Sequence, residues 1–205
     1  MIRKNKNIVF CISIFVVGIF LISCKFIYDY TKEQENEKKI QMFFENEVMD
    51  TKDTTIENEK SKKSEKKVEE KYIAILVIPN ISLKKGLYDK NSKNNNVNKN
   101  IQIIENSDMP DLENGTLILA GHSGSGEIAY FQKLEQLNLN DDVYIYYKEN
   151  KYHYKINSIY LEEKNGYITI NNSNEFSRIV LTTCSQKEKG KQLIIIGNLI
   201  EKSKY

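Results

Sequence analysis

Two residues of this 205-residue chain pair a nucleophile with a base, Cys184 and His122. Cys184 ends the run of β-forming residues in RIVLTTCSQ (178–186), and His122 follows the hydrophobic stretch LILAG at the start of a Gly/Ser loop. A thiol becomes a nucleophile when a neighbouring base or cation stabilises its thiolate. Side chains at strand ends are accessible and held by a rigid sheet. By itself the pattern leaves two interpretations open: a catalytic Cys–His pair, or a buried thiol and an ordinary loop histidine.

The second histidine, His153, lies in KYHYKINSIYL (151–161). Tyr152, Tyr154 and Ile156 alternate there with polar residues, which is the period of a strand with one buried face. We therefore interpret His153 as a strand residue without a part in the chemistry.

Charge and cysteine count exclude some classes of protein. The chain has 30 Lys and Arg against 28 Asp and Glu, a net charge of +2, so no basic excess points to a nucleic-acid partner. Cys11 and Cys24 lie in the apolar N-terminal segment, which leaves Cys184 alone in the rest of the chain. A disulfide framework is therefore not expected, and the single thiol is either buried or used.

The N-terminus predicts a membrane anchor. Basic residues occur within residues 1–7, and residues 8–24 follow without a charge. At about 1.5 Å per residue this segment nearly crosses a hydrocarbon core of about 30 Å, and it spans fully as residues 8–28 if Lys25 snorkels outward. Positive charge before the span keeps the N-terminus in the cytoplasm, so the remainder is expected outside the plasma membrane.

A lipid anchor is the alternative to this single-pass helix. The sequence LISC (21–24) resembles a lipobox, the signal for acylation of its cysteine, here Cys24. Both interpretations tether the protein to the membrane and place its body outside.

A charged linker is expected at residues 29–70. Within residues 31–70, 21 of 40 residues are charged, Gly and Pro are absent, and apolar residues are too sparse to bury a core. We expect a solvated stalk, partly helical over 32–50.

From residue 71 to 205 the composition is that of an all-β domain. Eight short hydrophobic or alternating segments are expected as strands: 72–78, 101–104, 115–121, 143–147, 151–161, 167–170, 177–184 and 192–200. Only EIAYFQKLEQLN (127–138) has helical spacing. Eight short strands in one domain predict an eight-stranded β-barrel with one short helix.

Three motifs in this domain resemble the sortase family of Gram-positive cysteine transpeptidases. AGHSG (120–124), followed by AYFQKLEQLNLNDDVYIY, is similar to the strand end that carries the family's histidine. VLTTC (180–184) is similar to the family's TLxTC signature, with Val180 in place of the first threonine. YIAILVIPNISLKKGLY (72–88) resembles the first strand, and the resemblance extends over about residues 71–200.

The resemblance implies a mechanism. Cys184 would attack the backbone carbonyl near the end of an LPxTG-like sorting signal to form a thioacyl-enzyme, and His122 would protonate the leaving amine. An amine of peptidoglycan or of a pilin lysine would then release the product. Thr183 resembles the family's substrate-contacting threonine. Two acyl transfers thus replace one difficult step.

One position departs from the family's pattern. Sortases carry an arginine on the strand after the cysteine, and Gln192 stands at that position, preceded by Lys191. Gln192 could donate a neutral hydrogen bond, and Lys191 could supply charge if the strand bulges. Arg178 cannot substitute, because six extended residues separate it from Cys184 by about 20 Å. Losing one oxyanion donor costs about 10²–10³ in rate.

Two rival functions remain at this point. A catalytically weak or inactive sortase-like module could bind sorting signals or surface proteins without cleaving them. A lipid-anchored structural protein with a buried Cys184 would do no chemistry at all. No cofactor is expected; Glu162 and Glu163, in the place of the family's specificity loop, could bind calcium or lie in an ordinary solvated turn.

Overall fold

The computed structural model describes residues 2–50, 70–168 and 175–205. It divides into two compact units, Met1–Lys38 and Lys39–Tyr205. The first unit is helical, part of α1 (Ile2–Asp50), and the second contains all the strands.

Within α1, the segment Ile8–Asn46 contains a stretch long and apolar enough to cross a membrane. None of the residues in its most apolar window is buried inside the protein. By length and composition it is suited to be a membrane anchor or a signal segment. The predicted helical part of the stalk, 32–50, is confirmed as helix, and residues 51–69 lie outside the described residues.

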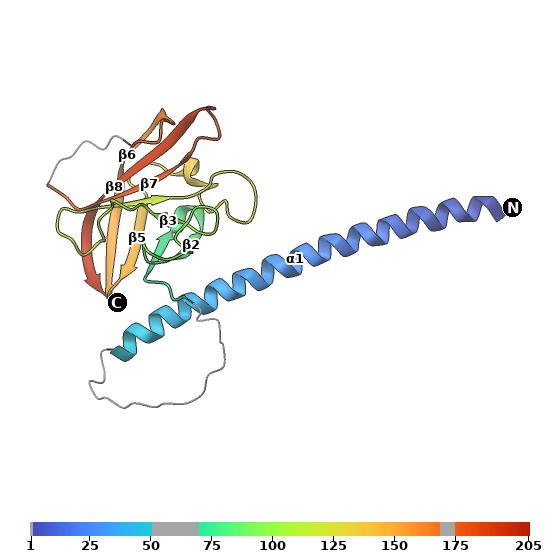
Figure 1. Cartoon of the computed structure of the whole chain (residues 1–205), viewed down its shortest axis with the longest axis horizontal. Helices are drawn as coiled ribbons and strands as arrows, with labels where there is room; N and C mark the ends of the chain where they lie inside the picture. The colour runs from blue at the N-terminus through green and yellow to red at the C-terminus, as the bar shows by residue number, and fades with distance from the viewer. Residues whose placement is uncertain (1, 51–69, 169–174) are drawn as a thin grey trace. The chain divides into compact units, whose positions relative to one another are not determined.

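Eight strands form one sheet in the order β2-β1-β5-β6-β8-β7-β4-β3, and β6, β8 and β7 lie side by side in Figure 1. Their bounds are β1 Ala74–Ile78, β2 Leu83–Leu87, β3 Gln102–Ile103, β4 Thr116–Ala120, β5 Asp142–Tyr147, β6 Asn150–Glu163, β7 Arg178–Cys184 and β8 Lys191–Lys204. The sheet curls into a nearly closed barrel, which confirms the predicted fold class. Every neighbouring pair is antiparallel except β4 and β7, which are parallel.

The alternating strands bury one face each, as their sequences predict. In β6, Tyr152, Tyr154 and Ile156 are buried while the residues between them are half-exposed. His153 is a strand residue that donates to Asp142 at 2.7 Å and stacks on Tyr144. Its position on β6, two strands away from β7, keeps it out of the Cys184 neighbourhood.

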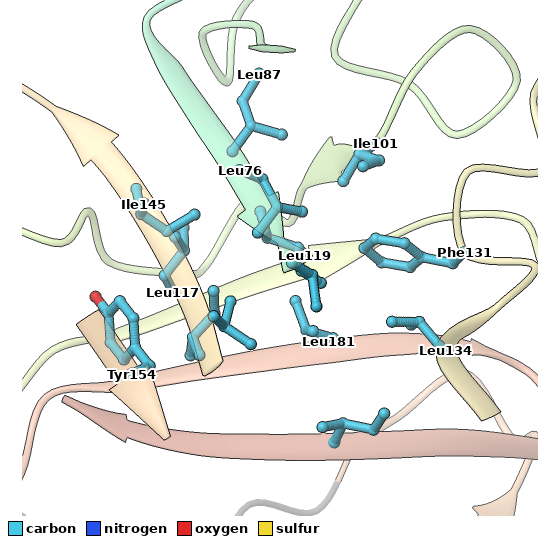
Figure 2. Close-up of a cluster of buried hydrophobic side chains, with 14 of the residues drawn as sticks. Leu76, Leu87, Ile101, Leu117, Leu119, Phe131, Leu134, Ile145, Tyr154 and Leu181 are labelled. Atoms are coloured by element: carbon cyan, nitrogen blue, oxygen red, sulfur yellow. The ribbon is translucent and has the colours of Figure 1, made fainter. Parts of the chain in front are cut away.

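The main core fills the barrel. Figure 2 shows side chains that converge there from four strands and from the β4–β5 connection: Leu76, Leu117, Leu119, Ile145, Leu181, Phe131 and Leu134. Burying each side chain of this kind contributes about 1.5–3 kcal/mol. A smaller apolar cluster, Val180, Ile194 and Ile196, lies on the other face of β7 and β8. β7 is therefore buried on both faces until its last residue.

Three segments differ from the predicted elements. Strand β2 was not predicted, because its sequence LKKGL is short and rich in lysine. It pairs with β1, and Gly86 makes room there for Tyr72, since a Cβ at this position would lie 2.0 Å from the Tyr72 ring. The expected helix 127–138 contains only turns and the 3₁₀ segment η2 (Leu134–Gln136). Of the expected strand 167–170, the first two residues are not in a strand and the others lie outside the described residues.

Asparagine side chains close the gap between the edge strands β2 and β3. Asn100, which precedes β3, donates its amide to the carbonyl of Gly86 in β2 at 2.8 Å and is 2% exposed. Asn95 bonds both backbone groups of Ile103 in β3, accepting from N–H at 2.7 Å and donating to the carbonyl at 2.9 Å. These amides satisfy backbone groups that an open sheet edge would leave unpaired.

The second unit also includes the last residues of α1. Ile40 and Phe43 are buried there in a cluster with Tyr72, Ile75 and Tyr88. At these two positions the expected solvated stalk differs from the structure, since the apolar residues of this stretch are few but lie three apart, on one helix face.

Candidate active site

The parallel pair β4–β7 brings the ends of two distant segments together. Their register runs from Thr116 opposite Arg178 to Ala120 opposite Thr182. If this register is continued by two residues beyond the end of the ladder, His122 is opposite Cys184. Neighbouring strands lie about 4.8 Å apart, and residues in register point to the same face. The predicted nucleophile and base are therefore neighbours at one end of the barrel.

Three hydrogen bonds extend this pairing past the last ladder residues. Gly121 N–H donates to the carbonyl of Thr182 at 3.2 Å, and the Thr183 hydroxyl donates to the carbonyl of Gly121 at 2.7 Å. The Ser123 hydroxyl donates to the carbonyl of Cys184 at 2.6 Å. The residues on both sides of His122 are thus bonded to the segment that ends in Cys184.

Gly121, the residue before His122, makes room for the ring of Phe131. A Cβ at position 121 would lie 2.9 Å from the ring of Phe131, which is fully buried. The backbone N–H of Phe131 also donates to the carbonyl of His122 at 2.9 Å. The glycine of the AGHS motif is therefore a packing requirement.

The thiol of Cys184 is free and its residue is exposed, although the six residues before it in β7 are buried. The alternative of a buried, inert thiol is therefore wrong. His122, at the corresponding end of β4, is half-buried. A sulfur open to solvent is accessible to a substrate, which is one requirement of nucleophilic catalysis.

Gln192 lies directly across from the nucleophile. Its Cα pairs with that of Cys184 in the β7–β8 ladder, whose register is continuous, and on its other side it pairs with Glu162 of β6. Its side-chain amide donates to the carbonyl of Tyr167 at 2.6 Å. Gln192, which the sequence suggested as a neutral hydrogen-bond donor, therefore lies beside Cys184, and its amide is hydrogen-bonded to the segment that follows β6.

Lys191 is not brought to this face. Without a bulge in the ladder, it projects to the side of the sheet opposite Gln192 and Cys184. Its ammonium pairs with Glu188 at 2.6 Å, and that hydrogen bond raises the pKa of Lys191 above its ordinary value. Its charge is therefore engaged away from the nucleophile.

Arg178 and Thr183 also lie apart from the exposed sulfur. Arg178 begins β7 and is 6% exposed, six residues before Cys184. The hydroxyl of Thr183 is buried and donates to the carbonyl of Gly121, so a substrate could use it only as an acceptor while that bond lasts. In the structure Thr183 joins the two strand ends.

The turn after Cys184 is fastened to η2. Glu135 accepts hydrogen bonds from the Ser185 hydroxyl at 3.0 Å and from the Gln186 N–H at 2.8 Å. The amide of Gln186 donates to the carbonyls of Ser123 at 2.7 Å and Gln132 at 2.6 Å. Burial alone would raise the pKa of Glu135, but these bonds and the charge of Lys187 outweigh it and hold the pKa below its ordinary value.

The sequence reasoning missed one contact of the predicted base. His122 Nε2 lies 3.1 Å from Asn98 Oδ1, in the loop between β2 and β3. Six of the ten residues in 91–100 are asparagine, so composition did not single out this one.

The described residues contain no group of three or more His, Cys, Asp and Glu that could hold a metal ion. Glu162 and Glu163 are consecutive residues of β6 and point to opposite faces, so the two carboxylates do not converge.

Comparison with known proteins places this geometry in context. The profile of the sortase domain family matches residues 76–200, more than half of the chain. Sortase A of Bacillus anthracis is 22% identical to the chain in an alignment of 196 positions, which covers 92% of each protein.

Solved structures share the fold. Sortase A of Listeria monocytogenes matches with a TM-score of 0.55 and 20% identity, over 65% of this chain and 90% of that one. A sortase D5 transpeptidase of Clostridium perfringens matches with a TM-score of 0.58 and 19% identity, over 82% and 98%. Sortase C of Streptococcus pneumoniae gives a TM-score of 0.57 and 20% identity, over 63% and 69%.

Proposed function

Because the chain belongs to the sortase family of cysteine transpeptidases, we propose that it cleaves an LPxTG-like sorting signal and transfers the acyl group to an amine. The observation that carries the proposal is the β4–β7 register, which sets His122 opposite an exposed Cys184. A thiolate, a proton donor and an open approach are the requirements of thioacyl formation.

In the first half-reaction, the Sγ of Cys184 attacks the scissile carbonyl carbon. The C–N bond breaks as the S–C bond forms, and His122 gives its proton to the leaving amine. In the second, an incoming amine attacks the thioester, His122 accepts its proton, and the sulfur leaves as thiolate. Water in place of the amine would make the reaction a hydrolysis.

The face around Cys184 supports a peptide substrate with apolar residues. Ile118 and Tyr160 are half-buried and pack against the cluster of Val180, Ile194 and Ile196 on this face. Gln192 supplies the neutral hydrogen-bond donor nearest to the sulfur on β8. We assign it to the oxyanion that develops during the attack, at the position where the sortase pattern has arginine.

We place the catalytic unit outside the plasma membrane, tethered by the apolar segment of α1, because basic residues precede that segment. Acylation at Cys24 is the alternative tether. Peptidoglycan or a pilin lysine would provide the acceptor amine.

The proposal is tested by intact-protein mass spectrometry. The full chain in detergent is incubated with a library of LPxTG-like peptides without an acceptor amine. We expect a mass increase equal to the acyl fragment, located on Cys184 and absent in Cys184→Ala. In His122→Ala the adduct should form more slowly. An adduct that persists in Cys184→Ala, or no adduct with any peptide, would contradict the proposal.

The absence of a positive charge at position 192 favours a second candidate, a module that binds sorting signals without cleaving them. Peptide binding without any adduct in the same experiment would support it.

A further inference from the structure

The asparagine-rich loop 91–100 is held rigidly by its own side chains. Buried Asn95 is bonded to both backbone groups of Ile103, and buried Asn100 is bonded to Gly86. Between them, the N–H groups of Lys99 and Asn100 both donate to the carbonyl of Asn96 at 2.8 Å. The loop is thus fixed to β2 and β3 on both sides of residues 96–99.

This arrangement delivers one exposed amide to the predicted base. Asn98 N–H donates to the side-chain oxygen of Asn96 at 2.9 Å, which fixes the backbone from which the Asn98 side chain extends. Asn98 Oδ1 lies 3.1 Å from His122 Nε2. An amide oxygen only accepts, so this contact is a hydrogen bond only in the tautomer whose proton is on Nε2, which would leave Nδ1 free to exchange one.

We propose that Asn98 is a positioning residue for His122, an inference that rests on the proposed function of Cys184. The contact selects the Nε2–H tautomer and the ring orientation, and it leaves Nδ1 for the thiol and the leaving amine. A nucleophile, a base and a group that orients the base form the arrangement common to acyl-transfer sites.

The neutral character of Asn98 fits this task. His153 shows the contrast within the same chain, because its nitrogens face the carboxylates of Asp142 at 2.7 Å and Glu201 at 3.7 Å. A carboxylate stabilises the imidazolium, whereas an amide fixes the ring with a smaller bias toward the charged form. A base that must take up and return a proton in each cycle is served by the neutral partner.

The test is nitrogen NMR of the full chain in detergent micelles with ¹⁵N-labelled histidine. Only two histidines contribute signals, and His153 is an internal reference. Above pH 8, where an ordinary imidazole is neutral, we expect a protonated Nε2 and a bare Nδ1 at His122. In Asn98→Ala the ratio of the two tautomers should change by about fivefold, the factor that one neutral hydrogen bond contributes.

Two variants sharpen the result. Asn98→Asp keeps an accepting oxygen and should retain the wild-type tautomer. Asn94→Ala removes an amide of the same loop that bonds Glu70 at 3.0 Å, and it should leave the His122 signals unchanged. The rate of thioacyl formation should fall about fivefold in Asn98→Ala and stay at the wild-type value in Asn94→Ala, with KM unchanged in both.

Identical His122 signals in the wild type and Asn98→Ala would overturn the inference, as would an equal change in Asn94→Ala. The spectra do not depend on a substrate. A tautomer change without any adduct on Cys184 would therefore reject the proposed function and leave the contact itself established.

Discussion

Gln192 faces Cys184 across the β7–β8 ladder, and the sequence resemblance predicts a guanidinium where it has a neutral amide. One of its amide protons is already bonded to Tyr167. The second is left for an oxyanion. A neutral donor stabilises a negative charge less than a charged one does, because charge-assisted hydrogen bonds are about twice as strong.

Gln192→Arg is therefore expected to increase turnover. A guanidinium has five donors, so it can keep the bond to Tyr167 and also reach the oxyanion. We expect kcat/KM to rise by at least about tenfold. The upper limit is the factor of about 10²–10³ that one oxyanion donor provides. Single-turnover peptide cleavage measures it.

The matched control for this change is Lys191→Arg, which adds a guanidinium on the opposite face of β8 and should leave the rate unchanged. If neither the wild type nor Gln192→Arg turned over the peptide, the result would support the binding module instead of the enzyme.

At the scale of elements, η2 and the turn after β7 are joined through a single carboxylate. Glu135 bonds Ser185 and Gln186, the two residues that follow the nucleophile. The pKa of Glu135 lies below its ordinary value, so this contribution to stability is present above the unfolded-state pKa of about 4.5. It is lost as the pH falls through the lower folded-state pKa.

Glu135→Gln should accordingly remove an acid-sensitive contribution. The difference in unfolding free energy between the wild type and the variant is expected to be largest near pH 7 and to shrink toward pH 3. Urea denaturation of the full chain in detergent at several pH values measures this difference. Glu113→Gln, at an exposed position, is the control. A difference that is constant with pH would show that the charge of Glu135 contributes nothing.

At the scale of the whole molecule, the barrel depends on how its two edge strands are joined. Backbone pairing does not connect β2 to β3, and the Asn100 amide bridges them through Gly86. A buried carbonyl that loses a donor carries a cost of desolvation.

Asn100→Ala is expected to lower the free energy of unfolding by about 1–3 kcal/mol. Chemical denaturation of the full chain measures this loss, with exposed Asn91→Ala as the control from the same loop. Equal stability of Asn100→Ala and the wild type would mean that the barrel does not depend on this bridge.

Much of the architecture could be predicted because its causes are local. Alternation of Tyr152, Tyr154 and Ile156 with polar neighbours identifies a half-buried strand wherever that strand pairs. A long uncharged stretch at the N-terminus suffices for a helix that can enter a membrane. The types of Cys184 and His122, each at the end of a hydrophobic run, likewise named the candidate nucleophile and base.

Other features depended on pairing between segments far apart in the chain. Positions 122 and 184 meet only because β4 and β7 are parallel and in one particular register. The register of β8 against β7 likewise determines that Gln192, and not Lys191, lies on the same face of the sheet as the sulfur. A shift of one residue would move every side chain of the strand to the opposite face. Asn98 became distinct from five other asparagines only once buried amides had fixed its loop. Residue types and periodicity are written into the sequence, whereas contacts between strands exist only after the barrel has closed.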